Sequence, residues 1–192
     1  MKNLDKISLL FLFLGIGFTL WEFSPKLSNS QIPAIITNDE APSFDYKVLN
    51  VHDGDTIKVK RGGQVLNVRF ACIDAPELKQ PGGVEARDYL KSLISRSGGV
   101  VGLNIISKDR YNRSVAEVWV NLPSEGFPQG SPNLVQSVLA SAGMVYGYEQ
   151  YKKDCPSWEA VQSSELYAKQ NRLGVWKNSN SQKPWEWRRG KK

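Results

Sequence analysis

Alternating apolar and polar residues predict a β-hairpin in the first half of the chain. Residues 56–61 alternate between apolar and basic side chains, and a Gly-Gly pair separates them from the longer apolar run of residues 64–73. Because two glycines between two such runs are typical of a tight turn, we expect the runs to pair as antiparallel strands. Residues 44–51 have the composition of a further strand that precedes the hairpin.

A second hairpin is predicted by residues 100–107 and 114–121, two strand-like runs on either side of the polar turn 108–112. Residues 122–132 follow, and they are rich in Pro, Gly and Ser. This composition is typical of a loop, so we expect no regular structure there.

Three segments have the apolar spacing of amphipathic helices. The first lies between Gly82 and Gly98, the second between Leu134 and Gly143, and the third covers residues 157–171. Strands, a helix, strands and then helices follow one another along the chain. This order predicts an α+β fold built on a small antiparallel barrel.

The amino terminus has the pattern of a targeting segment. Residues 7–21 carry no charge, follow a start that contains two lysines, and end before Glu22. They predict a hydrophobic helix that is either the core of a cleaved signal peptide or a short membrane anchor with Trp21 at the interface. Either outcome exports the rest of the chain, so we expect an extracytoplasmic protein that is secreted or attached to the membrane through residues 7–21.

Composition divides the chain into four parts. We expect a signal peptide or anchor in residues 1–23, a linker in 24–44, a folded domain in 45–178 and a basic tail in 179–192. Of 192 residues, 25 are Lys or Arg and 19 are Asp or Glu, and the net charge is +6. The basic excess favours a polyanionic partner, and the tail is either a solvated end or an aid to nucleic-acid binding.

Histidine and cysteine are too scarce for most transition-metal sites. His52 is the single histidine, and we expect it on the surface; Cys72 and Cys155 are the two cysteines. These numbers exclude Cys-rich and His-rich zinc sites and leave oxygen ligands, which hard cations prefer. In an exported domain the two cysteines could form a disulfide, or one could stay buried and the other exposed.

Acidic residues gather at the two ends of the first hairpin. Asp53 and Asp55 precede its first strand, and Asp74 and Glu77 follow its second. The hairpin therefore brings Asp55 and Asp74 side by side, and adjacent carboxylates need a cation or protons to neutralise them. The pattern indicates a Ca²⁺ site made of oxygen atoms, with a simple Asx turn at residues 53–56 as the alternative.

Together with these acids, two arginines indicate a type of reaction. Arg69 precedes Asp74 on the same strand, and Arg113 begins the outgoing strand of the second hairpin. Guanidinium groups beside a carboxylate-bound cation form a fork for phosphate oxygens. The set fits attack by water on a phosphodiester, in which the cation and the arginines stabilise charge on phosphorus.

In this order, the motifs closely resemble the staphylococcal nuclease (thermonuclease) family. The resemblance covers about residues 46–177 and rests on Gly54-Asp55-Thr56, Arg69, Asp74-Ala75-Pro76-Glu77 and Asp109-Arg110-Tyr111-Asn112-Arg113. It implies a five-stranded antiparallel barrel of the oligonucleotide/oligosaccharide-binding type with three helices. It also implies a monomeric Ca²⁺-dependent endonuclease that acts on DNA and RNA, favours single strands and leaves 3′-phosphate ends.

The resemblance also implies roles for Asp55, Asp74 and Glu77. Asp55 and Asp74 would bind calcium directly, together with the backbone carbonyl of Ala75, where the family commonly has Thr. Glu77 would deprotonate or orient the attacking water. Asp53 is not part of the resemblance; because it neighbours Asp55, we expect it to support the metal ligands, with a simple turn residue as the alternative.

The remaining implied roles concern the substrate. Arg69 and Arg113 would contact the phosphate, and Arg110 would add a cation near the scissile bond. Tyr146 and Tyr148 would line the nucleotide pocket. Asn112 stands where the family has Gly, and Asn tolerates the positive φ that such a turn requires.

Two other functions remain possible at this point. One is a non-catalytic nucleic-acid-binding barrel tethered to the membrane, and the other is an interaction module in which calcium is structural. The presence of both arginines and all three site acids favours the nuclease over either alternative.

Overall fold

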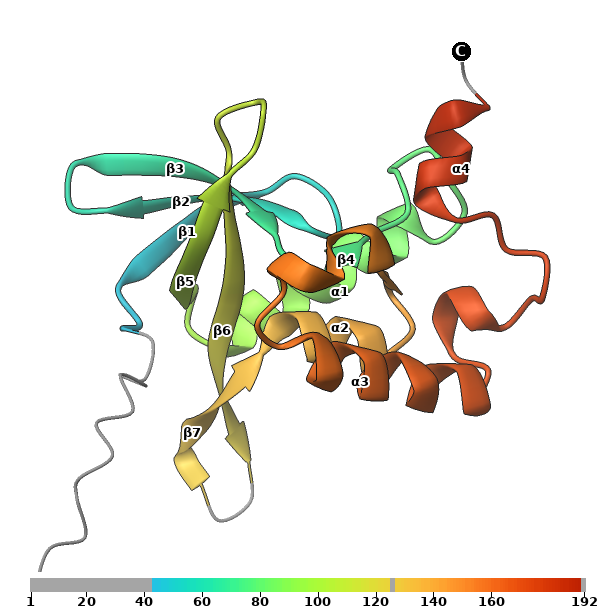
Figure 1. Cartoon of the computed structure of the whole chain (residues 1–192). Helices are drawn as coiled ribbons and strands as arrows, with labels where there is room; N and C mark the ends of the chain where they lie inside the picture. Colours follow the sequence, from blue (N-terminus) through green and yellow to red (C-terminus); the bar gives the residue numbers. More distant parts are fainter. Residues whose placement is uncertain (1–42, 125–126, 191–192) are drawn as a thin grey trace, which may run out of the picture. The chain divides into compact units, whose positions relative to one another are not determined.

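The computed structural model describes residues 43–124 and 127–190, which belong to one compact unit. Its centre is a barrel of five strands in the order β3-β2-β1-β5-β6, closed by a pairing between β3 and β6 (Figure 1). The strands are β1 Tyr46–Val51, β2 Thr56–Arg61, β3 Gln64–Phe70, β5 Val100–Lys108 and β6 Ser114–Ser124.

The closing pair is parallel, although every other neighbouring pair in the barrel is antiparallel. Five strands that alternate in direction leave the first and last pointing the same way, so an odd barrel must close on a parallel pair. The predicted α+β barrel is confirmed, with this one difference from a wholly antiparallel sheet.

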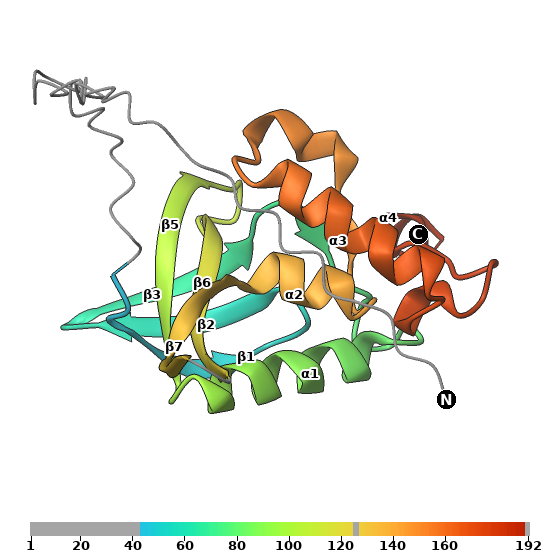
Figure 2. The ribbon, with the colours of Figure 1, turned by 90° about the horizontal axis from the view of Figure 1, so that it is seen from below.

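The predicted helices lie close to their expected bounds. They are α1 Gly83–Arg96, α2 Val135–Ser141 and α3 Trp158–Gln170. The three helices gather on one side of the barrel, as Figure 2 shows. Their apolar faces meet the inward-facing strand residues in a single core, whose fully buried members include Ile57, Val59, Val68, Phe70, Leu90, Leu93, Val118 and Leu139.

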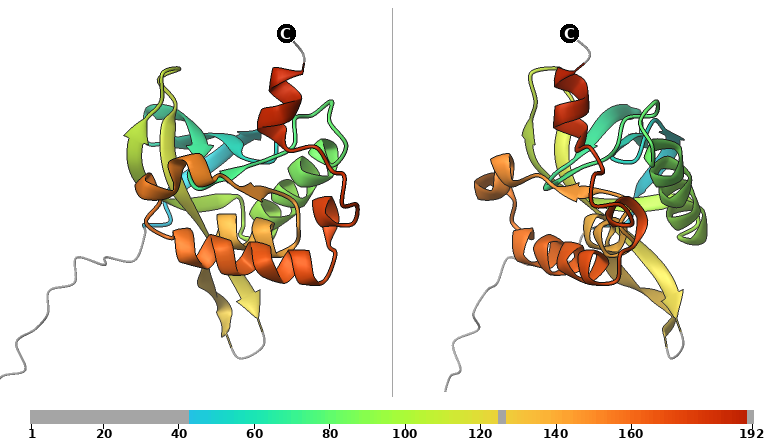
Figure 3. Two further views of the ribbon diagram at one scale, coloured as in Figure 1. Left: turned by 45° about the vertical axis from the view of Figure 1, so that its right-hand side comes forward. Right: turned by 90° about the vertical axis from the view of Figure 1, so that its right-hand side faces the viewer.

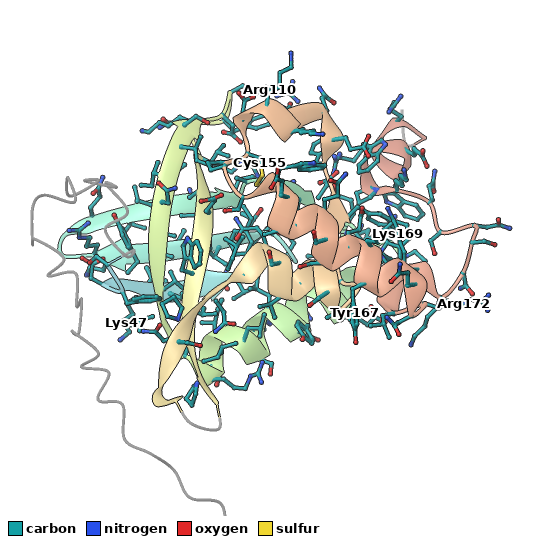
Figure 4. All side chains as sticks on the ribbon, turned by 60° about the horizontal axis from the view of Figure 1, so that its bottom comes forward. Lys47, Arg110, Cys155, Tyr167, Lys169 and Arg172 are labelled. Carbon is teal, nitrogen blue, oxygen red and sulfur yellow. A yellow bond between two sulfur atoms is a disulfide. The ribbon has the colours of Figure 1, made fainter. Side chains whose placement is uncertain are left out.

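A second, two-stranded sheet joins the end of the barrel to the helical part. It pairs β4 Ile73–Asp74 with β8 Tyr146–Gly147. The short 3₁₀ helix η1 Glu149–Asp154 follows β8 and ends at Cys155, which forms a disulfide with Cys72 (Figure 4). The pairing that the sequence left open is therefore present, and it ties β4 to η1.

The expected loop at residues 122–132 is wrong. Strand β6 runs on to Ser124, and β7 Phe127–Leu134 pairs with it in a hairpin beyond the barrel. Pro and Gly suggested a loop, but β7 is an edge strand with one neighbour. Proline is tolerated at such an edge because half of the backbone hydrogen-bonding groups need no partner strand.

The basic tail also differs from the expectation of a solvated end. After the 3₁₀ helix η2 Gly174–Trp176, residues Pro184–Arg189 form a short helix, α4. Proline at its first turn suits a helix start, because that position needs no backbone N–H donor. Figure 3 shows α4 on the same side of the molecule as the turn between β5 and β6.

The expected targeting segment and most of the linker fall outside the described residues. Within the described ranges 43–124 and 127–190, no helix is long and apolar enough to cross a membrane. The assignment of residues 7–21 as signal or anchor, and the four-part division of the chain, stay predictions.

Candidate functional site

The first hairpin and β4 bring Asp55 and Asp74 together. Thr56 pairs with Arg69 in the β2–β3 ladder, so Asp55 lies at the strand end from which the chain continues to Asp74. The backbone N–H of Ala75 donates to Asp55 Oδ2 at 2.6 Å, which fixes the carboxylate beside the second acid.

Arg69 bridges the two acids. Its Nη1 lies 2.8 Å from Asp55 Oδ2, and its Nη2 lies 2.8 Å from Asp74 Oδ1. The side chains of Asp55, Asp74 and Arg69 are only 7%, 1% and 15% exposed. The predicted juxtaposition is thus present, and because a single guanidinium spans both carboxylates, their oxygens face a common point.

The local electrostatics disfavour a second negative charge at this point. Burial, opposed by the positive charge of Arg69 and reinforced by the charges of Asp53 and Asp74, raises the pKa of Asp55 to about 7. Asp53 is close because its Oδ1 accepts the backbone N–H of Asp55 at 3.1 Å. A cation at the site would reverse this effect by stabilising the ionised carboxylate.

The donor set fits a hard cation. Among the described residues no three His, Cys, Asp or Glu side chains form a ready-made metal cluster. Two buried carboxylates nevertheless supply the kind of oxygen ligand that Ca²⁺ prefers.

Gly54 allows the loop before β2 to pack closely behind these acids. A Cβ at Gly54 would lie 2.7 Å from the Cβ of Ala75 and 2.8 Å from that of Ala86 in α1. Any larger residue would therefore push the Asp55 loop away from Asp74. The small side chain of Ala75 contributes to the same close approach.

The second hairpin presents the other arginine on a self-contained turn. Asp109 accepts the backbone N–H groups of Tyr111 and Arg113, both at 2.9 Å, and its Oδ2 lies 2.7 Å from Arg113 Nε. Burial opposes these hydrogen bonds but does not outweigh them, and they lower the pKa of Asp109. Asn112 has a φ of 61°, so the expected left-handed turn is confirmed.

Both halves of the site line one cavity of about 770 Å³. Its wall includes nearly every residue that the sequence singled out, namely Asp53, Asp55, Arg69, Asp74, Ala75, Glu77, Arg110, Arg113 and Tyr148. The arrangement can bind a cation on its acidic side and hold an anion between that side and the arginine turn.

Tyr146 lies beside this cavity instead of in its wall. It pairs with Asp74 across β4 and β8, is 2% exposed, and packs edge-on against Trp176 at a centroid distance of 4.9 Å. A smaller hollow of about 230 Å³ is lined by Tyr146, Tyr148 and Trp176. Burial raises the pKa of Tyr146. Tyr148 therefore faces both hollows, and Tyr146 only the smaller one.

The sequence did not identify two residues of α4 that reach the site. Arg188 Nη2 lies 2.7 Å from Asp74 Oδ2, and Arg188 Nη1 lies 2.9 Å from Glu77 Oε1. Trp185 stacks on Tyr148 with a centroid distance of 5.2 Å and an interplanar angle of 9°.

Burial alone would lower the pKa of Arg188, but its hydrogen bonds to Asp74 and Glu77 raise it well above the ordinary value. The Trp and Arg content of the tail is the only sequence signal for these contacts. That composition does not indicate that Arg188 contacts Asp74, 114 residues earlier in the chain.

The chain is similar in sequence to known nucleases. The family model described as staphylococcal nuclease homologue matches residues 67–178. A protein named micrococcal nuclease from Shigella flexneri is 36% identical over 151 residues, which are 78% of this chain and 83% of that protein. An uncharacterized endonuclease of Escherichia coli O157:H7 is 34% identical over 145 residues, 76% of this chain and 85% of that protein.

A plant protein shares the same region within a longer chain. Staphylococcal-like nuclease CAN1 of Arabidopsis thaliana is 30% identical over 149 residues, which are 77% of this chain and 39% of that protein. The family model covers more than half of the chain, and the bacterial relatives match along most of their own length. The chain belongs to the staphylococcal nuclease family.

Proposed function

We propose that this nuclease is an exported, Ca²⁺-dependent endonuclease that hydrolyses DNA and RNA with little sequence preference. One observation carries the proposal: the acids Asp55, Asp74 and Glu77 and the arginines Arg69 and Arg113 line one cavity. Carboxylates for a cation, guanidinium groups for a phosphate and a further carboxylate for water are the parts that phosphodiester hydrolysis needs.

Asp55 and Asp74 would hold Ca²⁺ through their carboxylates, with the backbone carbonyl of Ala75 as a third oxygen ligand. When bound, the ion supplies a Lewis acid that stabilises negative charge on the phosphate. The two carboxylates engage only two of the five N–H donors of Arg69, so the guanidinium keeps donors for phosphate oxygens.

Glu77 is placed to handle the water. Its side chain is 41% exposed at the cavity wall, so water reaches it, whereas that of Asp74 is 1% exposed. Glu77 would accept a proton from the water or orient it. The resulting hydroxide bonds to phosphorus, the bond from phosphorus to the 5′ oxygen breaks, and that oxygen takes up a proton. The products carry a 3′-phosphate and a 5′-hydroxyl.

Arg113 and Arg69 would stabilise the extra charge on the phosphate in the transition state. Arg113 is 30% exposed and is held at Nε by Asp109, which leaves its two terminal nitrogens for phosphate oxygens. Arg110 and Arg113 both lie over the ring of Tyr111, at 4.9 and 5.6 Å from its centroid. The turn thus concentrates positive charge at the cavity mouth.

Residues that line the same cavity account for the proposed low sequence preference and the preference for single strands. Tyr148 offers a ring for stacking, and stacking accepts any base but requires that the base leave its duplex. The phosphate contacts come from arginines, which carry no sequence information.

The disulfide supports export. Cys72 and Cys155 are paired, and disulfides persist in oxidising compartments outside the cytosol. Retention on the membrane through residues 7–21, and a monomeric state, remain part of the proposal. Mass measurement of the mature protein separates a cleaved signal from a retained anchor.

Digestion of heat-denatured DNA and of RNA, with Ca²⁺ and with a chelator in excess, tests the proposed reaction. We expect cleavage only with Ca²⁺, and product ends that a 3′-phosphatase can dephosphorylate. Metal-independent binding without cleavage would instead identify a nucleic-acid-binding barrel. Cleavage that persists in chelator would rule out the role given to Asp55 and Asp74.

A further inference from the structure

We propose that α4 is an autoinhibitory segment that competes with the cation and with a substrate base for the site. Arg188 pairs with Asp74, one of the two carboxylates that would bind the cation, and Trp185 stacks on the Tyr148 ring that would stack on the base. This inference rests on the proposed function and adds a means of regulation to it.

Arg188 uses the hydrogen-bonding capacity of Asp74 that a metal would need. Oδ2 of Asp74 receives Arg188 Nη2 at 2.7 Å, and Oδ1 receives Arg69 Nη2 at 2.8 Å and Arg188 Nη1 at 3.2 Å. Both oxygens are thus engaged by guanidinium groups. A carboxylate has about four lone-pair positions, and positive charges at this distance repel an incoming divalent cation.

The same guanidinium also holds Glu77. Arg188 Nη1 lies 2.9 Å from Glu77 Oε1, so one side chain ties the proposed water-handling acid to a metal ligand. With Oε1 held by a guanidinium, this carboxylate has fewer lone pairs left to accept a hydrogen bond from the attacking water. The docked Arg188 therefore opposes two functions of the site at once.

Trp185 lines the smaller hollow and covers one face of the Tyr148 ring. Its ring is nearly parallel to that of Tyr148, with 5.2 Å between centroids, and it meets Tyr146 edge-on at 6.1 Å. The ring of Tyr151 also meets that of Tyr148 edge-on, with 5.0 Å between centroids. A base can stack on Tyr148 in place of Trp185 but not together with it on that face.

The docking is of a kind that can be reversed. Helix α4 has only six residues, too few to be stable in water without its tertiary contacts. The side chain of Arg188 is 42% exposed and that of Glu77 is 41% exposed, so solvent competes for their ion pair. Other anchors include the ion pair of Arg188 with Asp74, the stacking of Trp185 on Tyr148, and a hydrogen bond from Gln80 to the Gln182 carbonyl.

Competition makes calcium affinity depend on the tail. If the docked state is populated about ten to one, it weakens the apparent calcium affinity about tenfold, and calcium must release the helix to the same extent. Substrate would add to this release by displacing Trp185.

Calorimetric titration of the full chain with Ca²⁺ alone tests the competition without any cleavage. We expect Arg188→Gln to bind Ca²⁺ about tenfold more tightly than the unmodified protein. Arg189→Gln is the matched control, because Arg189 lies on the same helix and bonds to the Trp185 carbonyl within it. We expect the control to bind Ca²⁺ as the unmodified protein does.

Hydrogen exchange gives a second measurement on the unmodified chain. We expect the amides of residues 185–190 to exchange faster when Ca²⁺ is added, while those of β2 do not. Trp185→Ala should lower the KM for denatured DNA and leave calcium affinity less affected than Arg188→Gln does.

An unchanged or weaker calcium affinity in Arg188→Gln, or an α4 that stays protected in Ca²⁺, would overturn the proposal. A higher KM in Trp185→Ala would also overturn it, because the tail would then belong to the substrate site. Failure of the proposed nuclease function would look different: calcium would bind and release the helix without any cleavage.

Discussion

The two halves of the site are built in opposite ways. Asp55, Asp74 and Arg69 come from barrel strands and from β4, and their side chains are 1–15% exposed. Asp109 and Arg113 belong to one turn, their side chains are 20% and 30% exposed, and the hydrogen bonds of Asp109 stay within five residues. The first half depends on the whole fold, and the second on a short stretch of chain.

Because of this difference, substitutions in the first half should change both stability and activity, and substitutions in the second half should change activity alone. Burial, helped by the charges of Asp53 and Asp74 and opposed by Arg69, raises the pKa of Asp55, so the ionised carboxylate costs stability and changes there alter the folding equilibrium as well as activity. Changes at the exposed turn leave the core untouched and should affect activity alone.

The sharpest way to test this separation is to remove the turn arginine. We expect Arg113→Ala to lower kcat/KM for denatured DNA by about 10³-fold, because a charge that stabilises the transition state is lost. The melting temperature should stay within about 2 °C, since the side chain is 30% exposed.

Arg110→Ala is the control for that variant, because Arg110 lies over the same Tyr111 ring. It should reduce kcat/KM by less than about tenfold. Equal losses in the two variants would show that the turn acts through its total charge and not through Arg113.

The next largest effect is expected at Glu77. Glu77→Gln keeps the shape of the side chain but removes the proton acceptor, so we expect kcat to fall by about 10²–10³-fold. Calcium affinity measured by calorimetry should not fall, and it should rise if loss of the Glu77–Arg188 ion pair loosens α4, whereas removal of a direct metal ligand would lower it. A variant that turns over normally would exclude Glu77 from the reaction.

Loss of the disulfide should weaken the barrel half of the site and spare the turn. The Cys72–Cys155 bond closes a separation of 83 residues, and the Cys72 carbonyl accepts the N–H of Tyr148 at 2.8 Å. We expect Cys72→Ala with Cys155→Ala to lower the free energy of unfolding by about 2–4 kcal/mol in denaturant titrations.

Calcium affinity should fall in the same double variant, because Asp74 follows Cys72 by two residues. Reducing agent should reproduce both effects in the unmodified protein and have none in the variant. Unchanged stability in both experiments would contradict a structural role for the disulfide.

The smallest effect is a pH dependence of stability. Asp55 has a pKa of about 7 in the folded protein against 3.8 unfolded, so the folded state holds its proton more tightly. Its contribution to stability is complete below about pH 4 and is lost as pH rises through 7. In chelator, Asp55→Asn should remove this part of the decline and raise the free energy of unfolding at pH 8 by about 1–2 kcal/mol.

Asp45→Asn is the control, because Asp45 forms an exposed ion pair with Arg61. It should leave the slope between pH 4 and 7 unchanged. Calcium affinity of the unmodified protein should rise over the same pH range, since ion and proton compete for Asp55. A flat stability profile would show that Asp55 is ionised throughout.

Local sequence patterns predicted much of this fold because turns, strand alternation and helix faces depend on residues close together in the chain. The Gly-Gly turn and the alternation after Thr56 predict the hairpin that aligns Asp55 with Arg69, and three apolar stripes predict the helices. The same logic failed at residues 122–132, where pairing with β6 outweighs an unfavourable composition.

By itself, the sequence determined the acids, the arginines and their order along two hairpins, since register and turn chemistry act over a few residues. Only the tertiary structure decided that Cys72 meets Cys155, that the barrel closes on a parallel pair, and that Arg188 lies against Asp74 and Glu77. These contacts join residues 46 to 114 positions apart. Whether such distant groups meet depends on the packing of the whole chain, which no local pattern encodes.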